Sequence, residues 1–461
     1  MSEQGRQAAI ERMQQAGVPE RAITVFAHYY DELERGATGT IAEDDIEPMH
    51  DPVRLADVQV DADEAREALA HTAIVKLNGG LGTSMGLNQA KSLLTVRDGA
   101  SFLDLIARQV LHVREQSGVP LPLLLMNSFR TREDSLAALS AYDTLPVPGL
   151  PLDFLQNREP KLLTADLSPA DWPADPSLEW CPPGHGDLYT ALETSGVLAA
   201  LLEAGYRYAS VSNSDNLGAV PDGTIAGWFA RSGAPYAAEV CDRTPADRKG
   251  GHLAYRRSDG QLILRETAQV SDEDEAAYSD LSRHPYFHTN NLWFDLRALA
   301  ETLDSRGGVL GLPLIRNVKT VDPADSSSPE VVQIETAMGA GIGVFPGAAA
   351  LAVERSRFLP VKTTNDLLLV RSDVYDLRDD SRLERVAPAP LIDLDSGAYK
   401  LVGDFEQRFS AGVPSLRAAE SLTVRGDWTF GVNVRVTGAA ILEGTGAVPD
   451  GAVVGPQGVS T

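Results

Sequence analysis

The spacing of hydrophobic and polar positions changes along the chain, and the N-terminal part has the spacing of a helix. Apolar side chains recur on one helix face at Ile23, Phe26, Tyr30 and Leu33. Gly36 and Gly39 end this run, and an acidic, proline-containing stretch follows at residues 43–52. We therefore expect residues 1–60 to form a helical segment that ends in a linker.

From about residue 70 to residue 375, short apolar runs alternate with longer helical stretches. The runs typical of strands are residues 73–77, 121–126, 152–155, 206–212 and 237–241. Residues 102–115 and 188–204 have helical character, and Ser101 with Asp104 forms an N-cap pattern before the first of them. This alternation predicts an α/β domain with a mainly parallel sheet.

Two segments depart from this alternation. In residues 252–270, Asp259 and Gly260 separate two strand-like runs, which predicts an antiparallel hairpin. Near the C-terminus, apolar side chains recur every six residues at Val424, Phe430, Val436, Leu442, Val448 and Val454. This period is typical of a short β-helix, whose exposed edge favours association with a second copy. Chance matches in a valine-rich tail are the alternative.

The composition is that of a folded, acidic protein. Hydrophobic residues make up 43% of the 461 residues, and 65 Asp and Glu outnumber 40 Lys and Arg, which gives a net charge of −25. These values argue against a disordered chain. They also argue against a nucleic-acid partner bound through broad phosphate neutralisation.

Redox, metal and membrane features are weak in this sequence. Cys181 and Cys241 form no Cys-x-x-Cys pair, and the eight histidines show no zinc spacing. No apolar run approaches the roughly 20 residues of a membrane span. The N-terminus lacks the apolar core of a signal peptide, so we expect a cytoplasmic protein.

Lysine is rare among the basic residues. Only seven of the 40 are lysines: Lys76, Lys91, Lys161, Lys249, Lys319, Lys362 and Lys400. Lysine is a compact charge on a flexible stem, whereas arginine carries a rigid planar fork. Two interpretations are open: codon bias, or retention of lysine where a mobile point charge is needed.

The strongest local feature is the glycine-rich segment IVKLNGGLGTSMGLNQAKS at residues 74–92. A predicted strand ends near Leu77, and the residues that follow include Asn78, Gly79, Gly80, Gly82, Gly86 and finally Lys91. Glycines let a backbone approach a ligand closely and turn its N–H groups toward an anion. Lys91 adds a mobile positive charge, so the segment is predicted to bind phosphate.

Three familiar motifs fit this segment only in part. A Walker A loop needs glycine where Met85 and Ala90 stand, and a dinucleotide fingerprint needs one residue fewer before Gly86. The residues from Gly82 to Gly86 match the G-x-S-x-G nucleophile elbow, but Ser84 lies well past the predicted strand end. A hydrolase therefore stays a minor alternative, as does a plain flexible loop.

Further strings carry a resemblance to a known family. They are MNSF at 126–129, CPPGHGD at 181–187, SNSDNLG at 212–218, TNNLW at 289–293 and RFLPVKTT at 357–364. Together with LNGGLGTSMG, they resemble the UTP–glucose-1-phosphate uridylyltransferases (UDP-glucose pyrophosphorylases) of the eukaryotic type. The resemblance runs from about residue 72 to residue 375.

The resemblance also implies a fold. It is a GT-A-like, Rossmann-like nucleotidyltransferase core with a mixed sheet and a C-terminal left-handed β-helix. The expected domains are the helical N-terminal segment at 1–60, the catalytic domain at 61–385 and the β-helix domain at 386–461. No nucleic-acid or membrane partner is implied, and the β-helix is a candidate surface for a homo-oligomer.

The reaction implied by the resemblance joins UTP and glucose 1-phosphate and yields UDP-glucose and pyrophosphate, with Mg²⁺ as cofactor. The attacking group is already a phosphate oxygen, so no serine or cysteine nucleophile is needed for in-line attack on the α-phosphorus. Positioning and electrostatic stabilisation of two polyanions would carry the step.

The resemblance assigns nucleotide contacts to Leu77, Asn78, Gly79, Gly80, Lys91, Gln156, Gly184, Asp215 and Lys362. Backbone groups of residues 77–80 would hold the base and ribose, and the Gln156 amide would pair with uracil. Lys91, Lys362 and Asp215 form the implied catalytic set. Asp215 is also the implied Mg²⁺ ligand, which suits hard-cation chemistry.

The sugar contacts implied by the resemblance are His185, Asn213, Glu266, Asn290 and Asn291. Gly184 and His185 would meet the uracil and the sugar phosphate, and Glu266 would accept hydrogen bonds from sugar hydroxyls. Which of Asn290 and Asn291 faces the sugar stays open.

Some positions depart from the family's pattern. Gln89-Ala90-Lys91 stands where the family often has Gly-Pro-Lys, which should loosen the loop slightly without removing the charge. Val318 replaces a frequent proline, and Lys249 lies in a matched string without an assigned role.

Other activities remain as alternatives. A UDP-N-acetylhexosamine pyrophosphorylase or a broad UDP-sugar pyrophosphorylase would share the glycine-rich loop and its lysine. A non-catalytic sugar-nucleotide sensor could dispense with Lys91, Asp215 and Lys362, and the presence of all three argues against it.

Overall fold

The computed structural model describes residues 2–248 and 250–460, so Lys249 lies outside the described residues. Within them, the centre is a mixed sheet of eight strands. Across the sheet they are β2 (Val53–Arg54), β18 (Ala349–Ala352), β12 (Tyr236–Asp242), β15 (Tyr286–Asp295), β11 (Tyr208–Asn213), β3 (Thr72–Asn78), β6 (Leu123–Asn127) and β7 (Asp153–Leu155). Strand β15 runs antiparallel to its neighbours β11 and β12, and the other neighbours pair in parallel. The predicted α/β domain with a mainly parallel sheet is confirmed.

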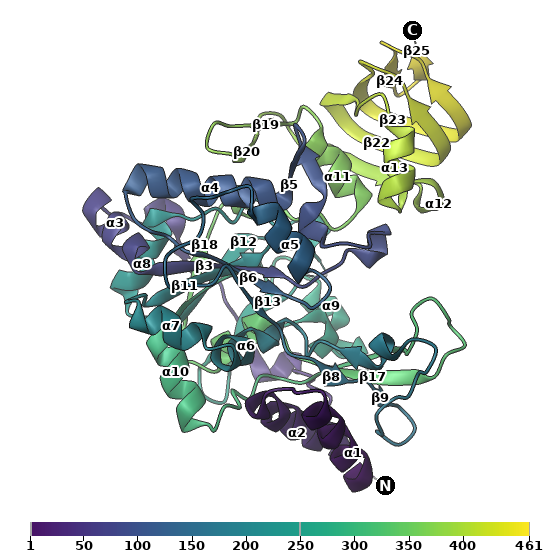
Figure 1. Cartoon of the computed structure of the whole chain (residues 1–461). Coiled ribbons are helices and arrows are strands. Elements are labelled where there is room, and N and C mark those ends of the chain that lie inside the picture. The colour runs from purple at the N-terminus through teal and green to yellow at the C-terminus, as the bar shows by residue number, and fades with distance from the viewer. Residues whose placement is uncertain (1, 249, 461) are drawn as a thin grey trace.

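Helices cover both faces of this sheet (Figure 1). One face carries α3 (Ala62–Ala70), α4 (Phe102–Ser117) and α8 (Gly223–Ser232), and the other carries α6 (Leu188–Thr194), α7 (Val197–Glu203) and α10 (Leu296–Ser305). The buried run of β3 explains this arrangement, because successive side chains point to opposite faces. Ile74 packs in the core with α4, whereas Ala73 and Val75 pack in the core with α6.

The predicted helices form with one difference. Helix α4 begins with the predicted capping box, in which the Ser101 and Asp104 side chains each accept from the other residue's backbone N–H. The predicted helix at 188–204 is two helices, because Gly196 between α6 and α7 has a left-handed φ of 78°. A short helix α5 (Arg132–Leu139) follows β6.

In residues 2–60 the α-helices end at Glu34, and two short 3-10 turns follow at Glu43–Asp45 and Leu55–Asp57. Helices α1 (Ser2–Gln15) and α2 (Glu20–Glu34) bury Phe26 and Tyr30 against Leu162 and Ile334 of the main body. The remaining smaller elements of the core are β4 (Thr95–Arg97), β5 (Ala100–Ser101), β8 (Glu159–Pro160), β9 (Leu162–Leu163), β10 (Trp180–Cys181), β16 (Ile315–Thr320), β17 (Glu330–Glu335), α9 (Glu275–Tyr278), α11 (Thr364–Arg371), β19 (Tyr375–Leu377) and β20 (Leu383–Arg385).

The linker predicted at residues 43–52 is wrong. Strand β1 (Ile46–Pro48) pairs antiparallel with β13 (His252–Arg256). Glu43 is buried and forms ion pairs with Arg265 and Arg283, and it bonds His284. These partners lie far away in sequence, so they hold the segment in the body of the protein although its composition is that of a loop.

The predicted hairpin is confirmed. Strands β13 and β14 (Leu262–Arg265) pair antiparallel around Gly260, which has a left-handed φ of 70°. The turn follows Asp259, whose carboxylate accepts the backbone N–H of Gln261.

The C-terminal part is a separate sheet, yellow-green to yellow in Figure 1. Its strands are β21 (Leu391–Leu394), β22 (Ser415–Phe430), β23 (Arg435–Val448), β24 (Val453–Gly455) and β25 (Gly458–Ser460), and helices α12 (Ser396–Tyr399) and α13 (Val402–Arg408) lie beside it. Val424 pairs with Leu442 and Phe430 with Val448, in parallel, so the partners are three six-residue steps apart. Every member of the six-residue series is buried. The period therefore marks the inward-facing positions of a parallel stack.

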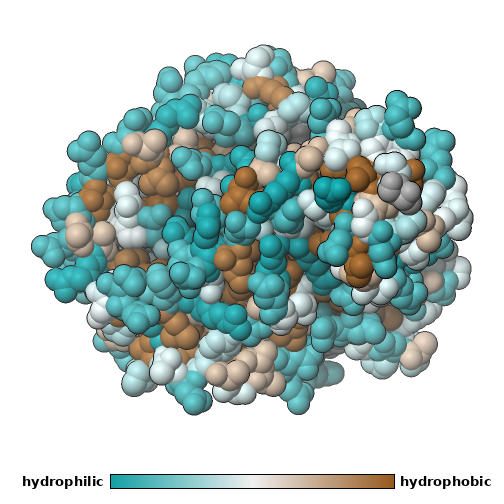
Figure 2. All heavy atoms as spheres, turned by 90° about the horizontal axis from the view of Figure 1, so that it is seen from above, coloured by the Kyte–Doolittle hydropathy of each residue, from teal (hydrophilic) through white to brown (hydrophobic). Residues whose placement is uncertain are grey.

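The face seen from above in Figure 2 is mostly hydrophilic, with hydrophobic residues scattered among the hydrophilic ones. No helix in the described part of the chain is long and apolar enough to cross a membrane.

Candidate active site

The glycine-rich loop leaves the end of β3 and closes around Lys91. Gly82 and Gly86 both have left-handed φ values, 64° and 74°, and flank a 3-10 turn at Thr83–Met85. A Cβ on Gly82 would lie 2.9 Å from Leu87 and 3.3 Å from the Lys91 stem, so a side chain there would crowd both. The Lys91 N–H donates to the Gly80 carbonyl at 3.1 Å. Since this segment is not a strand-to-helix turn, Ser84 does not lie on a nucleophile elbow.

Lys91 forms a close ion pair with Asp215. The Lys91 Nζ lies 2.6 Å from Asp215 Oδ2, and both side chains are less than 20% exposed. Asp215 follows β11, whose last residue Asn213 pairs with Leu77 of β3. The Ser214 N–H also donates to the Leu77 carbonyl at 3.1 Å. The carboxyl ends of two parallel strands therefore bring the loop lysine and the aspartate together.

Asp215 is a single carboxylate, not part of a metal-binding cluster. Among the described residues, no group of three or more His, Cys, Asp and Glu side chains could hold a metal ion. Mg²⁺ commonly binds one or two protein carboxylates and completes its octahedron with phosphate oxygens and water. The donor set here therefore suits Mg²⁺ that arrives with a phosphate ligand.

Gln156 lies against the glycine-rich loop. It follows β7, and its N–H donates to the Asn127 carbonyl at 2.9 Å. A Cβ on Gly79 would lie 2.7 Å from Gln156 Oε1. The Gln156 side chain can therefore lie this close to the loop because residue 79 is a glycine. The Asn78 side chain is turned into the core, where it donates to Asn127 Oδ1 and Ser135 Oγ, both at 2.7 Å. Asn78 therefore offers the site its backbone.

The CPPGHGD string forms a tight turn against Thr336. Gly184 has a φ of 77°, and a Cβ there would lie 2.6 Å from the Thr336 carbonyl oxygen. The Met338 N–H donates to Nδ1 of His185 at 2.9 Å. Because Nδ1 accepts this bond, the hydrogen of the neutral imidazole sits on Nε2, which is then a donor for an anionic ligand.

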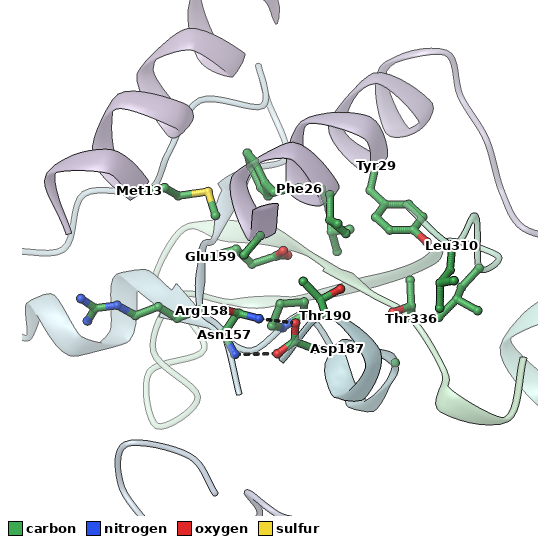
Figure 3. A pocket seen from close by; sticks show the side chains of 16 residues that line it. Met13, Phe26, Tyr29, Asn157, Arg158, Glu159, Asp187, Thr190, Leu310 and Thr336 are labelled. Carbon is green, nitrogen blue, oxygen red and sulfur yellow. Dashed lines mark hydrogen bonds between the residues drawn. The ribbon is translucent and has the colours of Figure 1, made fainter. Parts of the chain in front are cut away.

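Beneath this turn, Asp187 joins the two segments that carry Gln156 and His185. The backbone N–H and the Nδ2 of Asn157 donate to the two carboxylate oxygens of Asp187 at 2.5 and 2.8 Å, as Figure 3 shows. Burial raises the pKa of Asp187 to about 7, although the Asn157 hydrogen bonds oppose this. These hydrogen bonds therefore hold the segment that carries Gln156 and the segment that carries His185 in one position relative to each other.

A small cavity adjoins this contact, between α2 and the loops that carry Asn157 and Asp187 (Figure 3). Met13, Phe26 and Tyr29 line one side, and Glu159 lines the other. Burial and the Asp187 charge raise the pKa of Glu159 well above its usual range. This part of the site thus contains two buried carboxyl groups whose pKa values are both raised by burial.

Strand β15, which lies between β12 and β11 in the sheet, carries a bulge at Asn290 and Asn291. Asn290 has a left-handed φ of 60°, and its N–H donates to His288 Nδ1 at 3.2 Å. The Asn290 Oδ1 is buried and has no hydrogen-bond partner among the described residues. Asn291 instead donates from Nδ2 to Glu239 at 3.0 Å. Asn290 is thus the amide with unused hydrogen-bonding capacity, and the Asn291 side chain is turned into the core.

Glu266 and Lys362 lie within electrostatic range of each other. Glu266 follows β14, and a Cβ on Gly251 would lie 2.5 Å from its Oε2. Burial raises the pKa of Glu266, and the positive charge of Lys362 partly opposes this. Lys362 is exposed just before α11, whose Thr363–Asp366 capping box holds its backbone N–H.

Three buried charged residues have no role that the sequence predicts: Lys76, Glu239 and Arg357. Lys76 is fully buried on β3 and donates to Ser212 Oγ and to the Ala219 carbonyl at 2.7 and 2.8 Å. Burial and then the Arg357 charge lower the pKa of Lys76 to about 7. One signal was present in the sequence: Lys76 and Glu239 are single charged residues inside apolar strand runs.

Comparison with known proteins decides the family. The family model described as UTP--glucose-1-phosphate uridylyltransferase matches residues 23–437. The chain belongs to this family.

Relatives of this uridylyltransferase family cover nearly the whole chain. The enzyme named UTP--glucose-1-phosphate uridylyltransferase of Solanum tuberosum is 39% identical over 418 residues, which is 88% of this chain and 85% of that one. The enzyme with the same name from Saccharomyces cerevisiae is 39% identical over 425 residues, which is 91% of this chain and 83% of that one. A point mutant of the Leishmania major UDP-glucose pyrophosphorylase in complex with UDP-glucose superposes with a TM-score of 0.91, at 41% identity and with 98% of each chain covered.

Proposed function

We propose that this chain transfers the uridylyl group of UTP to glucose 1-phosphate, yielding UDP-glucose and pyrophosphate. Family membership over residues 23–437 and relatives with this name support the activity. The observation that carries the proposal is the close pairing of Lys91 with Asp215, at an edge where Gln156 and the glycine-rich loop also meet.

Uridylyl transfer requires that the phosphates are held in position and that positive charge stabilises them. The sugar phosphate oxygen forms a bond to the α-phosphorus of UTP, and the bond from that phosphorus to the pyrophosphate oxygen breaks. Lys91 and Lys362 stabilise the negative charge on the transferring phosphate and on the leaving pyrophosphate. His185 donates from Nε2 to a phosphate oxygen, in keeping with its Nδ1 accepting from Met338.

Asp215 would hold Mg²⁺ together with phosphate oxygens of UTP. Bound Mg²⁺ supplies charge neutralisation on the triphosphate. The Lys91 ammonium group lies 2.6 Å from the Asp215 carboxylate. UTP with Mg²⁺ would compete for both partners, so Lys91 would turn from the aspartate to the phosphates.

Base and sugar are recognised on opposite sides of the phosphates. Gln156 pairs with uracil, and the backbone of Leu77, Asn78, Gly79, Gly80 and Gly184 lines the nucleotide. Glu266, Asn213 and Asn290 bind the sugar. The unpartnered Asn290 Oδ1 favours Asn290 over Asn291 in this role.

Further family properties are part of the proposal. The catalytic core is GT-A-like, and the C-terminal parallel stack is a left-handed β-helix that is available for self-association. The pairing of its strands at three six-residue steps supports the second point. A cytoplasmic location, and domain boundaries near residues 60 and 385, also stay predictions.

The test is release of pyrophosphate from UTP, with Mg²⁺, in the presence of glucose, galactose or N-acetylglucosamine 1-phosphate. We expect glucose 1-phosphate to be the best acceptor. Lys362→Ala and Asp215→Ala should each lower kcat by about 10²–10³-fold, because each removes charge stabilisation. Lys319→Ala, a change at an exposed lysine on β16, serves as the control.

Two results would contradict the proposal. Faster turnover of N-acetylglucosamine 1-phosphate would overturn the substrate assignment. Undiminished pyrophosphate release by both Lys362→Ala and Asp215→Ala would overturn the assignment of the site.

A further inference from the structure

A buried carboxylate lies beneath the proposed sugar side of the site, and the donors to its oxygens come from two segments of the chain, β15 and the turn that contains Arg357. Glu239, on β12, is 1% exposed. Arg357 donates to both of its oxygens from Nε and Nη2 at 2.7 and 2.8 Å. Trp293 Nε1 and Asn291 Nδ2 each donate at 3.0 Å. Burial raises the pKa of Glu239, but Arg357 and these donors outweigh it and hold the pKa below its usual value.

Asn216 extends this network to the end of β11. Its Nδ2 donates to Asn291 Oδ1 at 3.0 Å and to the Arg357 carbonyl at 3.1 Å. Its Oδ1 accepts the backbone N–H groups of Gly218 and Leu359 at 3.1 and 2.8 Å. Both donors and both lone pairs of this buried amide are therefore used.

Each network residue stands close in sequence to a residue of the proposed site. Asn291 is next to Asn290 in the bulge of β15, and Arg357 begins the RFLPVKTT segment that ends with Lys362 and its cap. The bulge itself lies opposite Glu239, because the pairing of β12 with β15 shifts between Ala238 and Val240. The Glu239 carbonyl also accepts from Thr289 Oγ1 at 2.8 Å.

We propose that Glu239 is a positioning residue that sets Asn290 and Lys362 in place for the sugar phosphate. The proposal rests on the proposed uridylyl transfer. Glu239 touches no substrate. It acts through Arg357, which fixes the start of the segment leading to Lys362, and through Asn291, which turns the bulge so that Asn290 presents its amide.

A stabilising role alone would not require this arrangement. A buried ion pair is often replaced by apolar side chains with little or no loss of stability, so its presence alone is weak evidence for stabilisation. A fully satisfied polar network, in contrast, permits one geometry of its members. A misplacement of about 1 Å in a catalytic group can cost about 10²-fold in rate, so a rigid support has a functional consequence.

The base side of the site has different supports. The backbone of Ser214, next to Asp215, is bonded to Leu77, and Gln156 is held by Asn127. A change in the Glu239 network should therefore act on glucose 1-phosphate more than on UTP.

The experiment compares Arg357→Lys with Arg355→Lys in the full chain. Both arginines lie in the same 3-10 turn. Each forms a bidentate ion pair with a carboxylate, Arg357 with Glu239 and Arg355 with Asp247. Lysine keeps the charge but loses the planar fork. KM for each substrate, kcat and the urea midpoint of unfolding are measured for both variants.

We expect Arg357→Lys to raise KM for glucose 1-phosphate about tenfold and to lower kcat about tenfold, with KM for UTP within twofold of the wild type. Arg355→Lys should change each kinetic value less than twofold. Trp293→Phe removes one donor to Glu239 and leaves a smaller ring at a fully buried position, so it should also lower the unfolding midpoint. It should raise KM for glucose 1-phosphate about threefold, with KM for UTP within twofold of the wild type.

Several results would overturn the proposal. Equal kinetics of Arg357→Lys and Arg355→Lys would do so, as would equal increases in both KM values. If Arg357→Lys does not fold, an unchanged KM for glucose 1-phosphate in Trp293→Phe overturns it. Absence of turnover in the wild-type chain would instead remove the proposed function, and the positioning role with it.

Discussion

Two buried carboxyl groups support different parts of the proposed site, and they differ in the partners they meet. Glu239 on the sugar side is 1% exposed and Asp187 on the base side is 5% exposed. Glu239 accepts from the Arg357 guanidinium, and its pKa is held below the usual value. Asp187 accepts from the neutral Asn157, and burial raises its pKa to about 7. Similar burial thus leaves Glu239 charged and Asp187 only partly ionised near pH 7, because only Glu239 has a cationic partner.

The contrast extends to the neighbours of the two groups. Asp187 has Glu159 nearby, and the charge of Asp187 disfavours ionisation of the Glu159 side chain. Glu239 has Arg357 and, further off, Lys76, so positive charge surrounds it. We expect the sugar side to depend on an intact ion pair and the base side to depend on hydrogen bonds that tolerate neutral groups.

The largest expected effect is on folding stability after loss of the Glu239 carboxylate. Glu239→Ala should lower the free energy of unfolding by about 3–5 kcal/mol, because Arg357 is left buried without a counter-charge. Urea unfolding followed by fluorescence measures it, with the exposed Glu301→Ala on α10 as control.

The double variant Glu239→Leu/Arg357→Met should recover much of this stability, since no charge stays buried. Its activity with glucose 1-phosphate should stay low. A loss below about 1 kcal/mol in Glu239→Ala would show that the two sides do not differ as described.

The next effect concerns substrate binding on the base side. Gln156→Ala should raise KM for UTP about tenfold, because an amide that pairs with a base edge typically contributes about 1–2 kcal/mol. KM for glucose 1-phosphate should change less than twofold. Steady-state kinetics with each substrate varied in turn measures this, and Gln116→Ala on the exposed face of α4 is the control. An equal rise in both KM values would contradict the division into base and sugar sides.

A further effect is on the pH dependence of stability. Between the ordinary pKa of 3.8 and the raised pKa of about 7, folded Asp187 keeps a proton that the unfolded chain has lost. Its contribution to stability therefore falls as pH rises through this window, by at most about 1.4 kcal/mol per pH unit. Glu239 has the opposite sign, because a lowered pKa adds stability above its unfolded value and loses it as pH falls.

Asp187→Asn should therefore flatten the fall in stability between pH 5 and pH 7. The Asn157 side-chain amide can turn its oxygen toward the new amide, so hydrogen bonding is kept. Urea unfolding at several pH values measures the slope, and Asp134→Asn on the exposed side of α5 is the control. An unchanged slope of stability against pH would show that a group other than Asp187 titrates in this range.

Local signals in the sequence were sufficient for much of the fold. The alternation of apolar and polar runs located β3, β6, β11 and β12, and the capping box located the start of α4. The six-residue period identified the inward-facing positions of the C-terminal stack. These features depend on neighbours within a few residues, or on one repeat, so they are visible without a structure.

Features that depend on contacts between residues far apart in sequence could not be predicted from the sequence. The segment around Glu43 has the composition of a linker, but its partners are Arg265 and His284, more than 200 residues away. Asn290 and Asn291 are identical in type, and only the pairing of β15 with β12 decides which one turns inward. Glu239 stands alone in an apolar run, and its role depends on Arg357, which arrives from another segment.

The pairing of Lys91 with Asp215 at 2.6 Å has a consequence for selectivity among anions. A simple anion such as inorganic phosphate or sulfate meets the negative charge of Asp215 when it approaches Lys91, so the pair should disfavour its binding. Under the proposed function, a nucleoside triphosphate with its divalent cation would replace both partners at once, because Asp215 would hold the cation and Lys91 the phosphates. We therefore expect the site to prefer a metal-bound polyphosphate over simple anions.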